Sequence, residues 1–82
     1  MPDRLKTAKR IVGAKQTLKA VQGGQAKEVF VARDADGRVV QPIVDLCIRN
    51  GVRITEVDSM AELGKACSIE VGAAVAAIIE EN

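Results

Sequence analysis

Segments with the apolar spacing of helices alternate along the chain with short apolar runs typical of strands. The clearest helix pattern extends from about Ala14 to Gln22, where Leu18 and Val21 fall on one side of the helix. Gly23 and Gly24 follow this segment, in the position where glycine accommodates left-handed backbone geometry. The pattern predicts a short amphipathic helix that ends at two glycines.

Apolar runs and end signals predict the remaining elements. They are a short helix over 3–10, a strand over 27–32, a turn over 33–38, a helix over 39–50, a second strand over 52–57 and a helix over 59–67. Pro42 is tolerated in the first turn of its helix, and Gly51 marks the end of that helix. Ser59 stands three residues before Glu62, the spacing of a reciprocal helix cap. The alternation of strands and helices predicts a single sheet covered by helices on both faces.

The run AAVAAII, from Ala73 to Ile79, is ambiguous. Four of its seven residues are alanine, and alanine has the highest intrinsic helix propensity. Its length and complete apolarity also fit a strand that is buried on both faces of a sheet. Residue chemistry leaves both alternatives open.

Length and composition indicate one globular domain over residues 1–82. Apolar residues make up 48% of the chain and charged residues 28%, which is ordinary for a globular protein. No apolar run approaches the length of a membrane span, and no basic segment leads into an apolar one. We therefore expect a cytoplasmic protein without a membrane partner.

The net charge of +1 hides a marked polarity along the chain. Residues 1–27 contain seven basic side chains against Asp3 alone, whereas residues 28–82 contain five basic and ten acidic ones. A polyanion would be attracted only to the first third of the chain. A solvated basic face without a partner is the alternative.

The side-chain inventory argues against catalysis. The chain has no His, Tyr or Trp, and neither Cys47 nor Cys67 has a partner in sequence that would activate its thiol. We expect both to be reduced, buried thiols rather than a disulfide or a metal site. Asp34 and Asp36 precede Gly37 and are expected to form a turn or cap a helix rather than bind metal. No catalytic residue, metal or cofactor is predicted.

The aromatic content restricts how nucleic acid could be bound. Phe30 is the only aromatic residue and lies inside an apolar strand, so we expect it in the core. The protein therefore lacks the ring platform with which many sheet-based proteins stack single-stranded bases. Contacts to nucleic acid would have to come from a helix N-terminus and polar side chains.

The first turn of the helix over 14–22 offers such contacts. Gly13 lets another backbone approach the helix start, where free N–H groups attract phosphate. Lys15 can donate to guanine O6 and N7, and Gln16 carries both a donor and an acceptor. Lys19, one turn on, can hold a phosphate group. The alternative is an ordinary amphipathic helix with a polar outer face.

This motif has a wider context. The segments VGAKQTLKAVQGGQAKEVFVARDAD and SMAELGKACSIEVGAAVAAII, between Ile11 and Ile79, resemble the kink-turn-binding ribosomal protein family. The family includes the large-subunit proteins seven-Ae and thirty-e, and the resemblance is strongest to its small bacterial YbxF-type members. The family signature runs Gly-x-Asn-Glu-x-x-Lys, and Gly13 and Lys19 match it. Lys15 and Gln16 stand where the family usually has Asn and Glu.

The resemblance implies an α/β fold, a three-layer α-β-α sandwich with one mixed sheet of about four strands and helices on both faces. In it, 73–79 forms a strand. The implied partner is structured RNA that bends sharply at a bulge beside tandem sheared G·A pairs. In such proteins the signature helix reads the guanine edges, and an apolar loop covers the extruded bulge nucleotide. That loop corresponds here to Ile69, Glu70, Val71 and Gly72.

Other interpretations of the same residues stay open. The loop over 69–72 could be a plain turn with Ile69 and Val71 in the core. Met60 and Ala61 stand where the family carries lysines, which bears on affinity and RNA choice. The resemblance implies a monomeric kink-turn-binding protein that acts on ribosomal RNA or a riboswitch, with the ribosome as a candidate partner. The alternatives are a translation-associated protein–protein module that keeps the fold, and an enzyme whose substrate supplies the chemistry.

Overall fold

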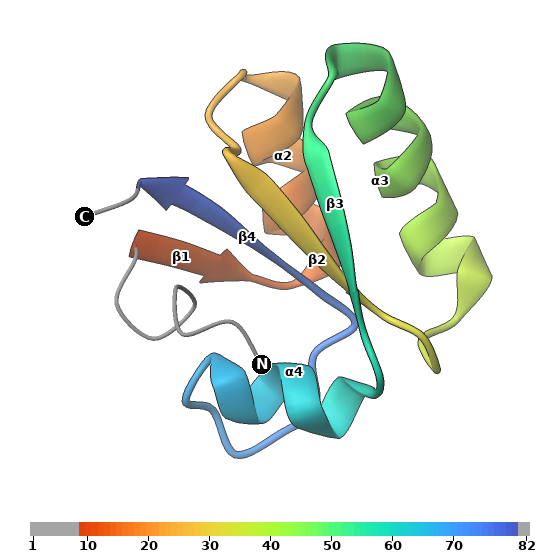
Figure 1. Cartoon of the computed structure of the whole chain (residues 1–82), viewed down its shortest axis with the longest axis vertical. Helices are drawn as coiled ribbons and strands as arrows, with labels where there is room; N and C mark the ends of the chain where they lie inside the picture. Colours follow the sequence, from red (N-terminus) through yellow and green to blue (C-terminus); the bar gives the residue numbers. More distant parts are fainter. Residues whose placement is uncertain (1–8, 81–82) are drawn as a thin grey trace.

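Four strands and three helices alternate along residues 9–80, the part of the chain that the computed structural model describes (Figure 1). The elements are β1 (Lys9–Val12), α2 (Ala14–Gln22), β2 (Glu28–Ala32), α3 (Gly37–Asn50), β3 (Arg53–Val57), α4 (Met60–Ala66) and β4 (Val75–Glu80). The strands form one sheet in the order β1-β4-β2-β3. β4 runs antiparallel to both β1 and β2, and β3 runs parallel to β2, so the sheet is mixed.

This strand order brings several loops to one edge of the sheet. Since β1, β2 and β3 all run opposite to β4, their C-terminal ends lie at the edge where β4 begins. Each of the three helices starts just after one of these strand ends, so all three helix N-termini are at that edge (Figure 1). We call it the upper edge of the sheet, although it lies toward the bottom of Figure 1, and we call the opposite one, toward the top of that figure, the lower edge.

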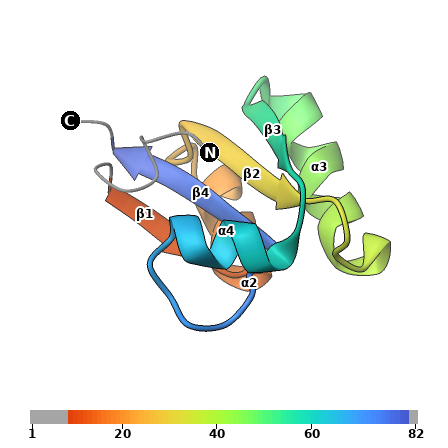
Figure 2. The same ribbon diagram turned by 60° about the horizontal axis from the view of Figure 1, so that its bottom comes forward.

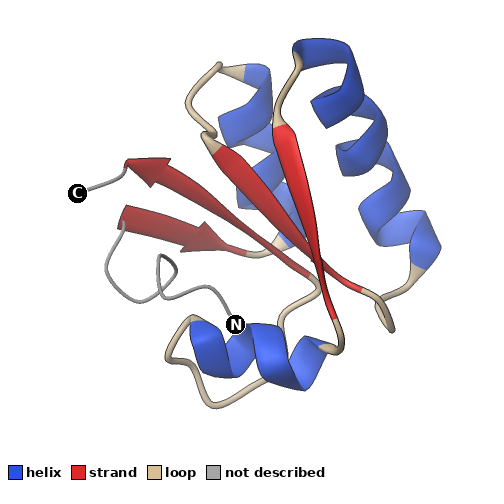
Figure 3. Cartoon of the chain, viewed as in Figure 1, coloured by secondary structure: helices blue, strands red, loops and turns tan. Residues whose placement is uncertain are grey.

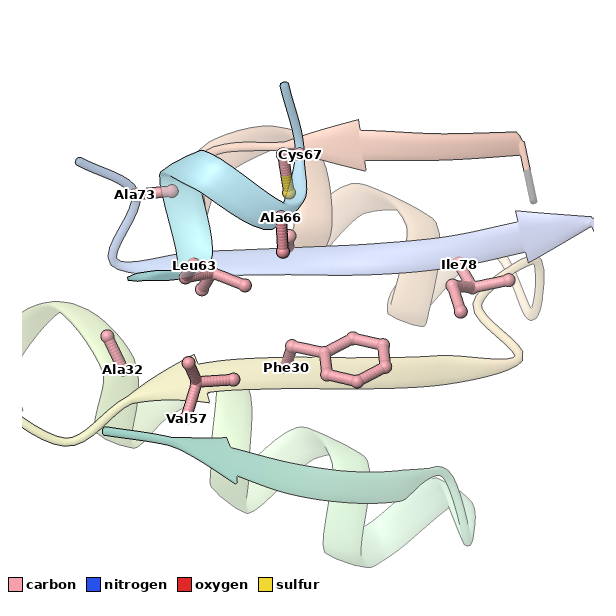
Figure 4. Packing of buried hydrophobic residues seen from close by; sticks show 9 residues of the cluster. Phe30, Ala32, Val57, Leu63, Ala66, Cys67, Ala73 and Ile78 are labelled. Atoms are coloured by element: carbon pink, nitrogen blue, oxygen red, sulfur yellow. The ribbon is translucent and has the colours of Figure 1, made fainter. Parts of the chain in front are cut away.

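Helices cover both faces of the sheet (Figure 3). One hydrophobic cluster joins the sheet to α4 and includes Phe30, Leu63 and Ile78 (Figure 4). The other joins the opposite face to α2 and α3 and includes Val21, Ile43 and Val75. The three-layer α-β-α sandwich implied by the resemblance is therefore confirmed, and Phe30 is fully buried in its core.

Most of the ambiguous run over 73–79 is a strand: β4 begins at Val75, two residues later than the run, and continues to Glu80. Val75 and Ala77 point into the cluster under α2 and α3, whereas Ala76 and Ile78 point into the cluster under α4. All four are fully buried. Tertiary burial on both faces outweighs the helix propensity of alanine here.

The helix starts follow the predicted cap chemistry. The Asp36 side chain accepts a hydrogen bond of 2.9 Å from the Arg38 backbone N–H, and α3 begins two residues earlier than expected. The Ser59 hydroxyl accepts one of 3.1 Å from the Glu62 backbone N–H. The helix over 14–22 and the strands over 27–32 and 52–57 are confirmed to within one residue.

The helix predicted over 3–10 is wrong at residues 9 and 10, the two that the structure describes. The short helix expected over 3–10 ends in residues that form strand β1, because Lys9 and Arg10 pair with β4. Residues 3–8 of that predicted helix lie outside the described part of the chain.

Candidate functional site

The start of α2 has the geometry of an anion-binding helix N-terminus. Gly13 caps the helix with φ 111° and ψ 149°, a backbone conformation that residues with a side chain rarely adopt. The first turn of α2 contains no acidic residue. The free backbone N–H groups there consequently keep their attraction for negative charge.

One side of α2 is exposed to solvent, and the other packs against the rest of the fold. Lys15, Gln16 and Lys19 are all exposed, as expected for a recognition surface. Thr17, Ala20 and Val21 are buried against the rest of the fold. The structure therefore leaves the three polar side chains of the motif available to a partner.

The loop between α4 and β4, residues 67–74, presents an apolar surface. Val71 is 71% exposed and Ile69 is 36% exposed. Glu70 and Gly72 are exposed as well. We call Ile69 and Val71 the apolar shelf. The interpretation of these two residues as core is wrong, because that interpretation required both to be buried.

The backbone of this loop is packed against α4 although its side chains face solvent. The Ile69 N–H donates to the Gly64 carbonyl oxygen, and the Ala73 N–H donates to the Met60 carbonyl oxygen, both at 3.0 Å. A Cβ on Gly64 would overlap the Val71 carbonyl oxygen and lie 3.2 Å from the Gly72 Cα. Only glycine at position 64 therefore allows the loop to approach the helix this closely.

The two segments of the site meet at the upper edge. The Gly13 N–H donates to the Val75 carbonyl oxygen at 3.0 Å, which joins the start of α2 to the residue at which the α4–β4 loop enters β4. Strand pairing continues this contact, since Val12 lies opposite Ala76. The turned view in Figure 2 shows the loop passing from the end of α4 back to the start of β4 on this side of the molecule.

The aspartates and cysteines act structurally. Asp34 accepts a 2.7 Å hydrogen bond from the Met60 backbone N–H and so holds the start of α4. Hydrogen bonds from Arg38 lower the pKa of Asp36, the cap of α3. Cys47 and Cys67 are buried free thiols, and burial raises the pKa of each. Among residues 9–80, no group of three or more His, Cys, Asp or Glu side chains could hold a metal ion.

Sequence reasoning missed two residues that shape the site. Gly64 lies inside a helix, and nothing in the neighbouring sequence indicates that the backbone of a later loop packs against it. The sequence pattern predicts a helix at Arg10, yet the Arg10 guanidinium donates to the Cys67 carbonyl oxygen, 57 residues away in the sequence. No local pattern could have indicated that pair.

A hollow of about 370 Å³ lies at the lower edge. It is lined by the ends of α2 and α3 and the residues that lead into β2 and β3, including Gln22, Lys27 and Asn50. It is therefore separated from the candidate site by the length of the sheet. No helix in the described part of the chain is long and apolar enough to cross a membrane.

Comparisons with known proteins agree with this architecture. An RNA-binding protein of Caldanaerobacter subterraneus subsp. tengcongensis is 51% identical over 69 residues, which is 84% of each chain. The RNA-binding protein YbxF of Geobacillus stearothermophilus is 45% identical over 75 residues, 92% of each chain. Among solved structures, the 15.5 kD RNA-binding protein of Giardia lamblia superposes with a TM-score of 0.82 at 33% identity; the match covers 95% of this chain and 64% of that longer one.

The family model described as ribosomal protein L7Ae/L30e/S12e/Gadd45 matches residues 1–82. The match spans both segments of the candidate site. The resemblance inferred from the two sequence segments is thereby confirmed, including the similarity to a YbxF-type protein. The chain belongs to the ribosomal protein L7Ae/L30e/S12e/Gadd45 family.

Proposed function

We propose that this protein binds structured RNA at kink-turns, sharp bends formed at a bulge beside tandem sheared G·A pairs. The start of α2 and the α4–β4 loop form one binding surface at the upper edge. The RNA is a ribosomal RNA or a riboswitch, and the protein acts by binding it as a monomer in the cytoplasm, without catalysing a reaction.

In this proposal α2 reads the G·A pairs. Lys15 donates to the O6 and N7 acceptors on the guanine edge. The Gln16 side-chain oxygen accepts from a guanine amino group, the contact that a carboxylate makes in the family signature. Lys19, one turn further along the helix, and the free N–H groups of the first turn hold phosphate.

The α4–β4 loop covers the extruded bulge nucleotide. Val71 and Ile69 offer it an apolar surface, and because the loop backbone is already fixed against α4, little ordering is needed on binding. Glu70 is an unusual neighbour for RNA. We assign it no direct contact, and its contribution is to the shape of the loop together with Gly72.

The observation that carries the proposal is the junction of the two segments. The Gly13 N–H to Val75 carbonyl bond places a basic helix start beside an exposed apolar loop. A guanine edge with its phosphates fits the first, and an unstacked base fits the second. The relatives named as RNA-binding proteins support RNA as the partner.

A binding titration tests this function. A kink-turn RNA and the same RNA with its G·A pairs replaced by Watson–Crick pairs are titrated with the protein at one salt concentration. We expect the intact kink-turn to bind at least about thirtyfold more tightly, because two base-edge contacts, each worth about 1–3 kcal/mol, together contribute about 2 kcal/mol or more. Equal binding of both RNAs would reject kink-turn recognition. Absence of binding to either would favour the protein–protein module.

A further inference from the structure

We propose that Arg10 is a positioning residue that fixes the apolar shelf relative to the start of α2. It does so by clamping the end of α4 to strand β1. Its effect on RNA binding rests on the proposed function, whereas its effect on the loop can be measured without RNA.

The contact is a two-donor clamp on a helix C-terminus. The Arg10 Nε and Nη2 both donate to the Cys67 carbonyl oxygen, at 3.2 and 2.6 Å, in a partly buried position. Cys67 is the C-cap residue of α4, where carbonyl groups lack helical partners and carry partial negative charge. A guanidinium satisfies such a group through a charged hydrogen bond, and its rigid fork lets two N–H groups reach one oxygen.

The clamp joins the two segments of the site through short pieces of chain. Arg10 precedes Gly13 by three residues, and Cys67 precedes Ile69 by two. The residue between Cys67 and Ile69 is Ser68, which adopts φ 63°, a left-handed conformation that is unfavourable for a residue with a side chain. Such a backbone persists when surrounding contacts hold it, and the Arg10 clamp is one of those contacts.

Cys67 provides a reporter of the clamp. Its side chain is 2% exposed in the cluster under α4, where Figure 4 shows it at the end of that helix. Cys47 is 0% exposed in the other cluster, on the opposite face of the sheet. Reaction of a buried thiol with a labelling reagent requires local opening, so the two rates report separately on the two faces.

The experiment compares Arg10→Met with Lys9→Met. Both changes remove one positive charge from β1, but Lys9 is exposed and makes no side-chain hydrogen bond to another residue of the described part of the chain, so the second variant controls for charge. Under native conditions we expect Arg10→Met to label at Cys67 about tenfold faster than the parent, since a charged hydrogen bond contributes about that factor. Labelling of Cys47 should be unchanged in both variants, and labelling of Cys67 unchanged in Lys9→Met.

The change in the thiol pKa that follows removal of Arg10 cannot by itself produce faster labelling of Cys67. Burial raises the pKa of Cys67, and the nearby Arg10 charge partly opposes that rise. Removing Arg10 therefore leaves less thiolate in the closed state, which would slow labelling. Faster labelling must then come from opening of the α4 end.

A double-mutant cycle with Val71→Ser tests the effect on RNA. If Arg10 acts through the shelf, Arg10→Met should weaken kink-turn binding several-fold in the parent and have almost no further effect in Val71→Ser. Arg10→Lys, which keeps the charge but not the fork, should recover only part of the loss.

Each result has a definite meaning. Unchanged Cys67 labelling in Arg10→Met, or equal acceleration at Cys67 and Cys47, overturns the clamp. Additive losses in the cycle, with full rescue by Arg10→Lys, mean that Arg10 contacts RNA phosphate directly and overturn the positioning role. If the parent fails to bind kink-turn RNA, the proposed function fails, and the labelling experiment alone decides whether Arg10 holds the loop.

Discussion

The start of α2 presents Lys15, Gln16 and Lys19 from the outer side of a regular helix, whereas the α4–β4 loop presents Ile69 and Val71 from an irregular backbone. In α2 the specific chemistry lies in polar side chains that are exposed to solvent. In the loop it lies in a backbone path that depends on Gly64 and on the hydrogen bonds to α4. Substitutions in α2 should therefore weaken RNA recognition and leave the structure intact, whereas substitutions in the backbone of the α4–β4 loop should disturb the structure first.

The largest expected effect is on the loop backbone, from Gly64→Ala. The added Cβ would overlap the Val71 carbonyl oxygen inside a packed contact. We expect the free energy of unfolding in urea to fall by about 2–3 kcal/mol, the upper part of the range of about 1–3 kcal/mol for overpacking a buried site. Gly37→Ala is the matched control, because a Cβ there meets nothing within 4 Å. A Gly64→Ala protein as stable as the parent would mean that the loop is not held in this way.

Substitutions at the start of α2 should act on binding instead. Lys15→Ala and Gln16→Ala should each weaken kink-turn binding by about 1–3 kcal/mol through the loss of a base-edge contact. Their unfolding free energies should stay close to that of the parent, because both side chains are exposed. Lys27→Ala removes an equivalent charge at the lower edge and should leave specific binding intact. If all three variants bind alike, the recognition surface is elsewhere.

Substitution of the exposed Val71 side chain should weaken RNA binding, as in α2, rather than lower stability, as in the loop backbone. Burying part of Val71 against a base contributes about 1 kcal/mol at roughly 25 cal/mol per Å². Val71→Ser should therefore weaken RNA binding several-fold and leave the melting temperature nearly unchanged. Ile48→Ser, at a residue 68% exposed on α3, removes a comparable apolar group away from the site. Ile69→Ser should lower both affinity and stability, because Ile69 is more buried than Val71.

Equal losses of affinity in Val71→Ser and Ile48→Ser would mean that the apolar shelf is not part of the RNA-binding site. Loss of stability in Val71→Ser, with affinity kept by the folded protein, would return Val71 to a purely structural role.

Substitution of Lys19 should change RNA affinity least, and the change should differ least from one RNA to another. As a phosphate contact, its loss in Lys19→Ala should weaken binding to all RNAs about equally and reduce the slope of log affinity against log salt by about 1. Stability should rise by at most a few tenths of a kcal/mol, because Lys15 and Lys19 repel each other one turn apart. A change confined to kink-turn RNA would identify Lys19 as a base contact instead.

Local patterns predicted elements whose signals are local. The helix Ala14–Gln22 follows from its apolar spacing and its terminal glycines, and the caps at Asp36 and Ser59 follow from side chains within three residues of their partners. The run over 73–79 could not be assigned from its own residues, because alanine favours helix in isolation. Burial between two layers made it a strand, and only the family resemblance indicated this beforehand.

Parts of the site were likewise beyond local reasoning. Lys15, Gln16 and Lys19 could be chosen because exposed polar residues at a helix start are visible in sequence. Arg10 could not be chosen, since its partner is 57 residues away and the local pattern around Arg10 predicts a helix. Gly64 could not, because its role depends on the path of a loop that returns to it after α4 has ended.

A titration of isotope-labelled protein with a kink-turn RNA, followed by the backbone amide chemical shifts, tests directly whether the two segments bind RNA together. We expect the large shifts on both segments of the upper edge, Gly13 to Gln16 and Ile69 to Gly72. Gln22, Lys27 and Asn50, around the hollow at the lower edge, should be unaffected. Shifts on only one segment would mean that α2 and the α4–β4 loop do not bind RNA together. Shifts centred on the lower edge or on α3 would contradict the proposed site altogether.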